Sequence, residues 1–561
     1  AWAKDTVDEH RLFYWFDPLP ARNAGGYKLR QGMTKTYEVW LGADGAIPPH
    51  DRPLMPVCPP AWYAKSMVFG EFGAADPDRE VVRDYDAKVN EAFGAYLKDR
   101  EDSREYGQFN FGDWWGERVI NWGNIEYDTQ HAFFLQFARS GDLRFLQAGE
   151  EAERHNRDID TVQYHQDPLR LGRVYSHCIG HVGDYLAKSP LEGPNRGSPH
   201  GGFSPSHTWC EGHTDHYFLT GDRRSQATAR KIADNYASYG TVNYDFHNCR
   251  EPGWDLIFTM AVYRGTGDPF YLNAAQIIVE RVLERQTEEA ALGSAGGGWR
   301  RRLVPGHCLC EPAHYGNAGF MVGVLLTGLK WYHLETQDER VARAIHLGSR
   351  FLVADMWVPE VQGFRYTTCP KSSAGPWANL LLFDGMGYAY RLSGDKDLAR
   401  ILAQGTDAAI QSLSGWGKSY TMYIRVAPHV LGLLAELRES PPLPLPRLMA
   451  DVPTPLSGRT AVAFDASGTR LPKGTVASCT WDFGDGSTGT GVKVEHSYAA
   501  GQYRAVLSVK AGDQTETAAT AISVPPPEVL TASPDRAVLV EAESFSAQGG
   551  GKVKVATGRK G

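Results

Sequence analysis

The sequence predicts a multi-domain chain: a remnant of a β-domain, a closed or nearly closed ring of helical hairpins, and then an all-β module. Short apolar–polar alternations occupy residues 1–58, and a helical periodicity extends from there to about residue 438. Pro-rich segments then border a stretch rich in Thr, Val, Ala and Ser. At 561 residues the chain is also too long for one ordinary domain.

The first segment, residues 1–58, has the pattern of β-strands. Runs such as Arg11–Phe16 and Thr34–Trp40 alternate apolar and polar side chains and are separated by Pro and Gly turns. These strands are too few to close a sheet. We therefore expect them to be the end of a β-domain whose beginning is missing from this chain.

One short pattern recurs through the helical segment, residues 59–438. An apolar helix precedes each copy, a residue that is Gly in all but one copy closes that helix, and Asp caps the amide groups that open the next. The copies are Ser140–Asp142, Thr220–Asp222, Thr266–Asp268, Thr336–Asp338 and Ser393–Asp395. With a further pair of helices around 79–135, they predict a ring of hairpins. Their spacing is too irregular for a simple solenoid repeat.

The remainder divides at two Pro-rich linkers, 439–455 and 526–536. Between them, residues 456–525 have the composition of an all-β module. Beyond the second linker, residues 537–561 look like the first strand of a further domain that the chain does not complete.

Composition limits the function classes. A net charge of −8 argues against a nucleic-acid partner, and no apolar run is long enough for membrane insertion. The chain opens with Ala1-Trp2-Ala3 and carries no signal peptide, so we expect a processed or truncated stretch of a secreted protein. The 15 Trp and 26 Tyr residues suit a carbohydrate partner, although most such rings fill cores.

The eight cysteines are scattered, and we expect buried thiols or one or two disulfides. Cys308 and Cys310 stand closer than an ordinary zinc half-site, and no second cysteine pair follows. His177 and His181, with Glu211 or His213, could hold zinc, but the Glu typical of a zinc-protease helix is absent between the two histidines. We therefore assign no metal ligand and no certain cofactor.

Two segments of the C-terminal part resemble known modules. Trp481–Ser487, followed by His496-Ser497-Tyr498 and Tyr503, resembles the PKD module, an immunoglobulin-like β-sandwich that acts as a spacer in secreted bacterial enzymes. Glu541–Gly550 resembles the opening of a jelly-roll carbohydrate-binding module. That resemblance implies a polymeric sugar partner and makes calcium plausible near Glu541 and Glu543.

The helical segment resembles the exo-rhamnogalacturonan lyase-like family of polysaccharide lyases. The resemblance rests on Gly112–Arg118, Asn124–Asp128 and Ser204–His213, with Leu29–Thr36 matching the end of the preceding domain. It implies a RIFT-type β-barrel followed by an (α/α)6 toroid that carries the active site.

The site follows from the positions of polar residues relative to the Gly-Asp turns. If the turns mark one end of the ring, the helix starts mark the other, and polar groups there would converge on one cleft. Helix N-termini also favour an anionic ligand such as a uronate carboxylate. The residues that we expect to bind substrate are Asn124, Tyr127, Asp128, Trp122, Glu211, His314 and Trp209.

Two reactions fit these groups. In β-elimination of a uronic-acid polysaccharide, His207 or His181 would take the C5 proton, Tyr315 or Tyr244 would protonate the leaving oxygen, and Arg250 would neutralise the carboxylate with Asn124. In hydrolysis, two carboxyl groups would flank the bond, and Asp113, Asp128, Glu211 and Glu251 could supply them. A non-catalytic carbohydrate-binding scaffold is the third alternative. We prefer the lyase.

Overall fold

The computed structural model describes residues 32–34, 36, 55–102, 113–114, 123, 125–175, 203–240, 244–287, 296–413, 417–452 and 459–524. Two compact units divide the chain, one within 1–445 and 470–476 and the other within 446–469 and 477–561.

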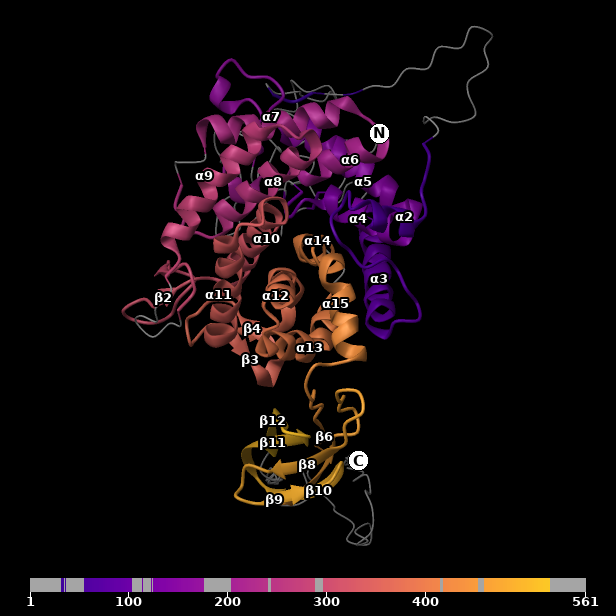
Figure 1. Cartoon of the computed structure of the whole chain (residues 1–561), viewed down its shortest axis with the longest axis vertical. Coiled ribbons are helices and arrows are strands. Elements are labelled where there is room, and N and C mark those ends of the chain that lie inside the picture. The colour runs from indigo at the N-terminus through magenta and orange to yellow at the C-terminus, as the bar shows by residue number, and fades with distance from the viewer. Residues whose placement is uncertain are drawn as a thin grey trace, which may run out of the picture. The chain divides into compact units, whose positions relative to one another are not determined.

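The first unit is a double ring of helices (Figure 1). Each inner helix packs against the next, and the last also packs against the first, so the ring is closed. The inner helices are α4 (Thr129–Ser140), α6 (Glu211–Thr220), α8 (Arg250–Thr266), α10 (Gly319–Thr336), α12 (Asn379–Ser393) and α15 (Ala427–Glu439). The outer helices are α3 (Glu80–Asp102), α5 (Leu143–His155), α7 (Arg223–Tyr239), α9 (Pro269–Arg285), α11 (Glu339–Met356) and α13 (Lys396–Gln411). The predicted toroid of helical hairpins is confirmed.

The hairpin turns have the predicted cap chemistry. Gly141 closes α4 with a positive φ of 75°, and the side chain of Asp142 accepts a hydrogen bond from the Arg144 amide at the start of α5. In the one copy without Gly, Gln337 takes the same left-handed conformation with a φ of 55°. The same two local interactions therefore end one helix and begin the next at each turn.

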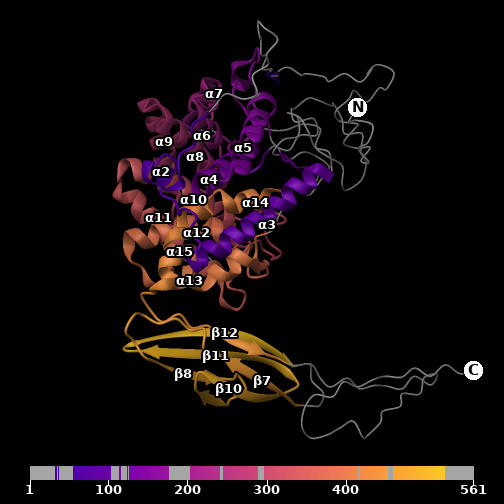
Figure 2. The same cartoon turned by 90° about the vertical axis from the view of Figure 1, so that its right-hand side faces the viewer.

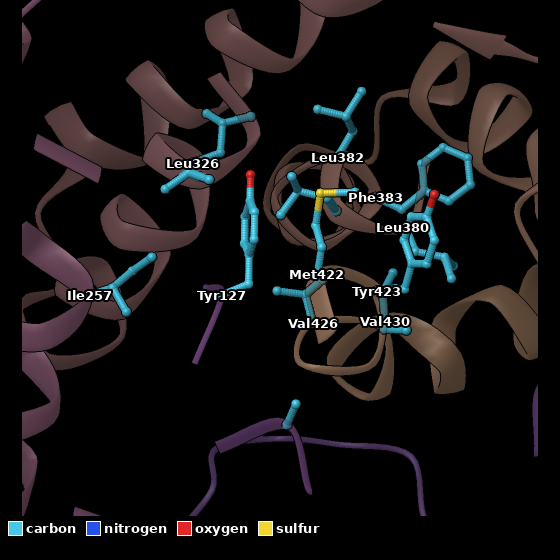
Figure 3. Packing of buried hydrophobic residues seen from close by; sticks show 14 of the residues in the cluster. Tyr127, Ile257, Leu326, Leu380, Leu382, Phe383, Met422, Tyr423, Val426 and Val430 are labelled. Atoms are coloured by element: carbon cyan, nitrogen blue, oxygen red, sulfur yellow. The ribbon is translucent and has the colours of Figure 1, made fainter. Parts of the chain in front are cut away.

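Burial explains which helices lie inside. Apolar residues cover most of the surface of α10, which is buried along nearly its whole length. By contrast α13 buries one stripe that includes Leu398, Ile401 and Leu402 and exposes its other face. Figure 3 shows side chains from several inner elements, among them Tyr127, Leu326 and Met422, facing one another in the core.

The two ends of the ring differ. The turn rim is the end where the five inner helices α4, α6, α8, α10 and α12 finish in the hairpin turns, and α2 (Pro60–Ser66) precedes the segment that lines it. The start rim is the opposite end, where these five helices begin. Its long connections carry short elements: η2 (Asn156–Asp160), η3 (Pro168–Arg170), η4 (Pro205–His207), β1 (Arg301–Arg302), β2 (Tyr315–Gly316), β3 (Trp357–Val358), η5 (Pro359–Val361), β4 (Gly363–Arg365), β5 (Ala374–Gly375), η6 (Pro376–Ala378) and α14 (Gly417–Ile424).

The second unit is a two-sheet β-sandwich (Figure 2). One sheet has the order β12-β11-β8-β9 and the other β10-β7-β6, all antiparallel. The ring of Phe464 lies 5.3 Å from Trp481 and 5.4 Å from Phe483, which joins the sheets through a core. The strands are β6 (Met449–Asp451), β7 (Arg459–Asp465), β8 (Ala477–Asp482), β9 (Thr488–Thr490), β10 (Lys493–Ala499), β11 (Gly501–Ala511) and β12 (Gln514–Val524).

One predicted boundary needs correction. Strand β6 pairs with β7, with Met449 opposite Asp465, although its residues fall within the predicted linker 439–455. A Pro-rich composition misled the prediction, because an edge strand tolerates neighbouring prolines.

Some predictions fall outside the described residues. These are nearly all of the β-domain remnant 1–58, the second linker 526–536, and the start of the carbohydrate-binding module at 537–561 with its possible calcium ligands Glu541 and Glu543. Among the described helices, none has the length and apolar character that a bilayer crossing requires.

Candidate active site

A buried carboxylate, Glu126, joins two of the predicted catalytic residues. Its Oε1 lies 3.7 Å from Nε2 of His207 and forms an ion pair with the guanidinium of Arg250. The three residues come from three separate elements of the start rim: the turn before α4, η4 and the first residue of α8. Glu126, His207 and Arg250 are referred to below as the rim triad. The predicted convergence of His207 and Arg250 is therefore observed, around a residue that was not predicted.

Local hydrogen bonds fix the orientation of His207. The side chain of Ser204 caps η4 by accepting from the Ser206 amide at 3.2 Å, and Ser206 Oγ lies 3.1 Å from His207 Nδ1. Because Nδ1 is engaged there, Nε2 is the nitrogen that faces Glu126. The imidazole is 17% exposed, so a ligand can reach it.

Arg250 is held as a cation at the N-terminus of α8. Its guanidinium carbon lies 5.7 Å from the ring centroid of Tyr127 and 5.8 Å from that of Phe320. Burial lowers the pKa of Arg250, but Tyr127 and Glu126 raise it to above its usual range. The start rim thus keeps a fixed positive charge next to an imidazole.

Asp128 serves as a double helix cap. It is fully buried, and its carboxylate accepts hydrogen bonds from the amides of Cys210, Glu211 and Gly212 at 3.0, 2.9 and 3.3 Å. It also accepts from the His131 amide at 3.4 Å, so it caps both α4 and α6. The structure therefore gives Asp128 a capping role, and its predicted roles in substrate contact or hydrolysis stay predictions.

Tyr127 and Trp209 form the floor beneath the rim triad. Trp209 is 1% exposed and packs 6.1 Å from Tyr127 and 4.8 Å from Trp254, measured between ring centroids. Tyr127 is also buried, with a φ of 76°. Both rings are buried in this structure, and their assignment as substrate-binding residues stays a prediction. Tyr127 packs against Arg250, and Trp209 packs against His207.

Glu211 is occupied inside the ring. It forms a buried ion pair with Arg425, whose guanidinium carbon lies 4.6 Å from the ring centroid of Trp254. In this structure the carboxylate of Glu211 is therefore paired with a buried arginine, and its substrate contact stays a prediction.

Tyr244 is committed to an internal partner. Its hydroxyl donates to Asp255 Oδ2 at 2.9 Å, and burial together with Asp255 raises the pKa of Tyr244 well above its usual value. Burial also raises the pKa of Asp255 to about 7, against the lowering effect of hydrogen bonds from Tyr244 and Thr259. A phenol held in this way is a poor acid. Tyr315 is therefore the better candidate for the group that protonates the leaving oxygen.

His314 and Tyr315 lie on the same rim. Tyr315 pairs with Arg302 across the β1–β2 ladder, and the His314 carbonyl accepts from the Leu303 amide at 2.9 Å. The next polar residue, Asn317, donates to the His247 carbonyl at 2.9 Å, which places β2 against the turn before α8. The side chains of His314 and Tyr315 are both half-buried.

Three further groups near Arg250 did not enter the predicted lyase site. Arg301 lies 3.6 Å from Asp245, and the pKa of Glu251 is raised by burial and by Asp245. Tyr366 stacks on Phe320 with centroids 5.5 Å apart. Glu126 itself could have been found, because it lies within the same short segment as Asn124, Tyr127 and Asp128.

Three predicted residues lie outside the described part of the chain: His181, Asn124 and Trp122. Their roles stay predictions. The zinc set suggested for His177 and His181 loses its other members, because Glu211 is paired and both ring nitrogens of His213 lie within 3.0 Å of Glu153 or Asn156.

Two groups of described residues have donor atoms close enough to share an ion. One is Asp113, His155 and Asp160, fully enclosed, and the other is Cys308, Cys310 and Cys369. In each group the donor atoms lie within 4.8 Å of one another. The cysteine group was not predicted, since Cys369 is distant in sequence.

A pocket lies at the turn rim. It is bordered by the last turns of α8, α10 and α12. Its charged residues are paired with one another: Lys330 with Asp384, and Arg391 with Glu71 at 2.6 Å. The pocket does not include the rim triad.

Comparisons with solved structures give low similarities. An unsaturated glucuronyl hydrolase from Bacillus sp. GL1, responsible for the degradation of glycosaminoglycan, is 12% identical, covering 63% of this chain and 96% of that one with a TM-score of 0.40. A polysaccharide lyase is 11% identical, covering 63% and 98% with a TM-score of 0.44. At these values the likenesses carry no argument about the reaction. The predicted membership of the exo-rhamnogalacturonan lyase-like family is not confirmed.

The C-terminal unit gives a more specific result. Its most similar structures include the PKD1 domain of Vibrio anguillarum Epp, 24% identical over 15% of this chain and 96% of that one, with a TM-score of 0.13. No curated protein matches the chain. The family model for the PKD domain matches residues 444–524, and this segment is therefore a PKD domain, as its motifs predicted.

Proposed function

We propose that the chain is a carbohydrate-active enzyme that cleaves a uronic-acid-containing polysaccharide by β-elimination at the start rim. The observation that carries the proposal is the rim triad, in which one buried carboxylate holds an imidazole and a guanidinium at the same opening. A PKD domain suits a secreted enzyme that acts on a polymer.

The triad supplies what the reaction needs. Arg250 would neutralise the uronate carboxylate, which makes the C5 proton more acidic. His207 would accept that proton through Nε2, because its Nδ1 is engaged by Ser206. Glu126 would keep both side chains in place and stabilise the imidazolium that forms.

The leaving oxygen at C4 then needs a proton. Tyr315 is the candidate, since it lies on β2 against the turn that precedes Arg250, whereas Tyr244 is bound to Asp255. Asn124, in the segment before Glu126, stays the proposed second contact for the carboxylate.

Hydrolysis is the second candidate because two carboxyl groups lie near Arg250 in different surroundings. Glu126 forms an ion pair with the Arg250 guanidinium, while the pKa of Glu251 is raised by burial and by Asp245, as a general acid requires. In this mechanism Glu251 would protonate the leaving group and Glu126 would act as base or nucleophile.

One assay separates these reactions. Incubating the full chain with a panel of uronic-acid polysaccharides should give ultraviolet absorbance from a new C4–C5 double bond. New reducing ends without that absorbance would establish hydrolysis instead. Binding without either product would establish a carbohydrate-binding protein.

The variant that tests the base is His207→Ala. We expect turnover to fall about 10²- to 10⁴-fold with the fold intact. His165→Ala is the control, because His165 is a half-buried histidine that contacts the Asp167 amide and not the rim triad. Unchanged turnover in His207→Ala would remove His207 from the mechanism.

A further inference from the structure

Three cysteines from two separate loops lie in mutual contact at the start rim. Cys308 and Cys310 belong to the loop between β1 and β2, and Cys369 belongs to the loop between β4 and β5. The Sγ atom of Cys369 lies 3.4 Å from that of Cys308 and 3.6 Å from that of Cys310. We propose that these three thiolates form a zinc site that fastens the two loops together.

The spacing of the sulfur atoms matches tetrahedral zinc. With Zn–S bonds of about 2.3 Å, two sulfur ligands stand about 3.8 Å apart. The two shorter separations lie near this value, and all three Sγ atoms fall within 4.8 Å of one another. One corner of the tetrahedron is left for water or an added ligand.

The backbone around the cluster favours a thiolate. The amides of Cys310 and His314 both donate to Cys308 Sγ, at 3.4 and 3.2 Å. Such N–H···S bonds stabilise negative charge on sulfur and orient it toward a metal. A disulfide between two of the cysteines, the competing state, would leave the third sulfur out.

The site would also support the wall beside the rim triad. Thr367 connects the loops by donating to the His307 carbonyl at 2.8 Å and accepting from the Cys369 amide at 3.3 Å. The adjacent Tyr366 stacks on Phe320, which in turn lies 5.8 Å from the guanidinium carbon of Arg250. The zinc would therefore hold in position the residues that pack against Arg250.

The metal content of the full chain tests the site directly. Protein purified without chelator should contain zinc, and removing it with a chelator should expose the three thiols to alkylation, as read by mass spectrometry of the peptides. Titration of the metal-free chain with zinc alone should restore protection of the thiols, whereas magnesium and calcium should not.

Matched variants assign the zinc to this cluster. Cys310→Ser should lower zinc affinity by more than about tenfold, whereas Cys58→Ser, a half-buried cysteine outside the cluster, should not change it. Equal zinc content in Cys310→Ser and wild type would place the metal elsewhere and overturn the proposal.

The wild-type chain also provides a test that does not depend on the folding of a variant. A peptide that joins Cys369 to Cys308 or Cys310 through a disulfide in fresh protein would overturn the site, as would alkylation that a chelator leaves unchanged. Thiol protection that is lost with zinc and regained with zinc supports it.

Discussion

The two ends of the helical ring are built from the same inner helices but use charge in opposite ways. At the turn rim, tight hairpins leave a pocket whose ionic groups pair with neighbours, such as Lys330 with Asp384. At the start rim, long loops bring an imidazole and a guanidinium to one carboxylate, Glu126. A pocket is therefore not by itself the better site, because the groups around it are already committed to structure.

The histidines show the same contrast. At the turn rim, burial and the nearby Lys330 lower the pKa of His429 to about 3, and its Nδ1 lies 2.7 Å from the Glu71 carbonyl. Such an imidazole stays neutral and is a weak base. His207 instead faces the carboxylate of Glu126, with its Nε2 3.7 Å from Oε1. The two imidazoles therefore differ in their partners: a backbone carbonyl for His429 and a side-chain carboxylate for His207.

The largest expected effect is on stability, from breaking the buried pair at the turn rim. Lys330→Met leaves the Asp384 carboxylate buried without its cation, and we expect a loss of about 3–5 kcal/mol in unfolding free energy. Denaturant unfolding measures it. Turnover per folded molecule should not change.

A double variant provides the control for this prediction. Lys330→Met with Asp384→Leu removes both charges, so stability should recover toward wild type. A single variant that is as stable as wild type, or a double variant that is no more stable than the single, would contradict the structural role of this pair.

The next effect is on activity, at the start rim. Glu126→Gln keeps the shape of the side chain but removes the charge that holds Arg250 and His207. We expect turnover to fall about 10²-fold, with a smaller change in KM, because the base loses its orienting partner. Glu71→Gln is the matched control, since Glu71 pairs with Arg391 at the turn rim. Wild-type turnover in Glu126→Gln would show that the charge of Glu126 is not needed for activity, which would contradict the proposed difference between the two ends.

The state of His429 at the turn rim also predicts how stability depends on pH. The folded pKa of His429 lies below its unfolded value of about 6.5, so the folded protein binds fewer protons than the unfolded chain between these pH values. Its contribution to stability is complete above pH 6.5 and is lost as the pH falls toward 3, by up to about 1.4 kcal/mol per pH unit.

The pH dependence is checked with His429→Gln. Between pH 7 and pH 4 the midpoint temperature of thermal unfolding should fall less steeply in this variant than in wild type, because the glutamine does not titrate. His165→Gln should keep the wild-type slope. Parallel curves for His429→Gln and wild type would show that His429 is not held neutral.

Local chemistry explains what could be predicted from the sequence. The Gly-Asp turns depend on neighbours within two residues, such as Asp142 and the Arg144 amide, so the pattern alone indicates the hairpins. The convergence of His207 and Arg250 followed from placing the helix starts at one end. Both inferences use only periodicity and capping.

Long-range contacts explain what could not be predicted. Whether Asp128 lines a cleft or caps two helices depends on amides more than 80 residues away, at 210 to 212. Glu211 is similar, because Arg425 is far along the chain. Polar residues at helix starts serve both purposes, and only the packing separates them.

The smallest expected effect tests the hairpins themselves. Asp268 accepts a hydrogen bond from the Phe270 amide at 3.0 Å as the cap of α9 and has no ion pair among the described residues. Asp268→Ala should therefore lower the unfolding free energy by about 1 kcal/mol, whereas Asp268→Asn, which keeps the acceptor oxygen, should cost only a few tenths. Equal losses in both variants would mean that charge, and not the cap, is responsible. Because this turn lies at the turn rim, neither variant should change turnover at the other end of the ring.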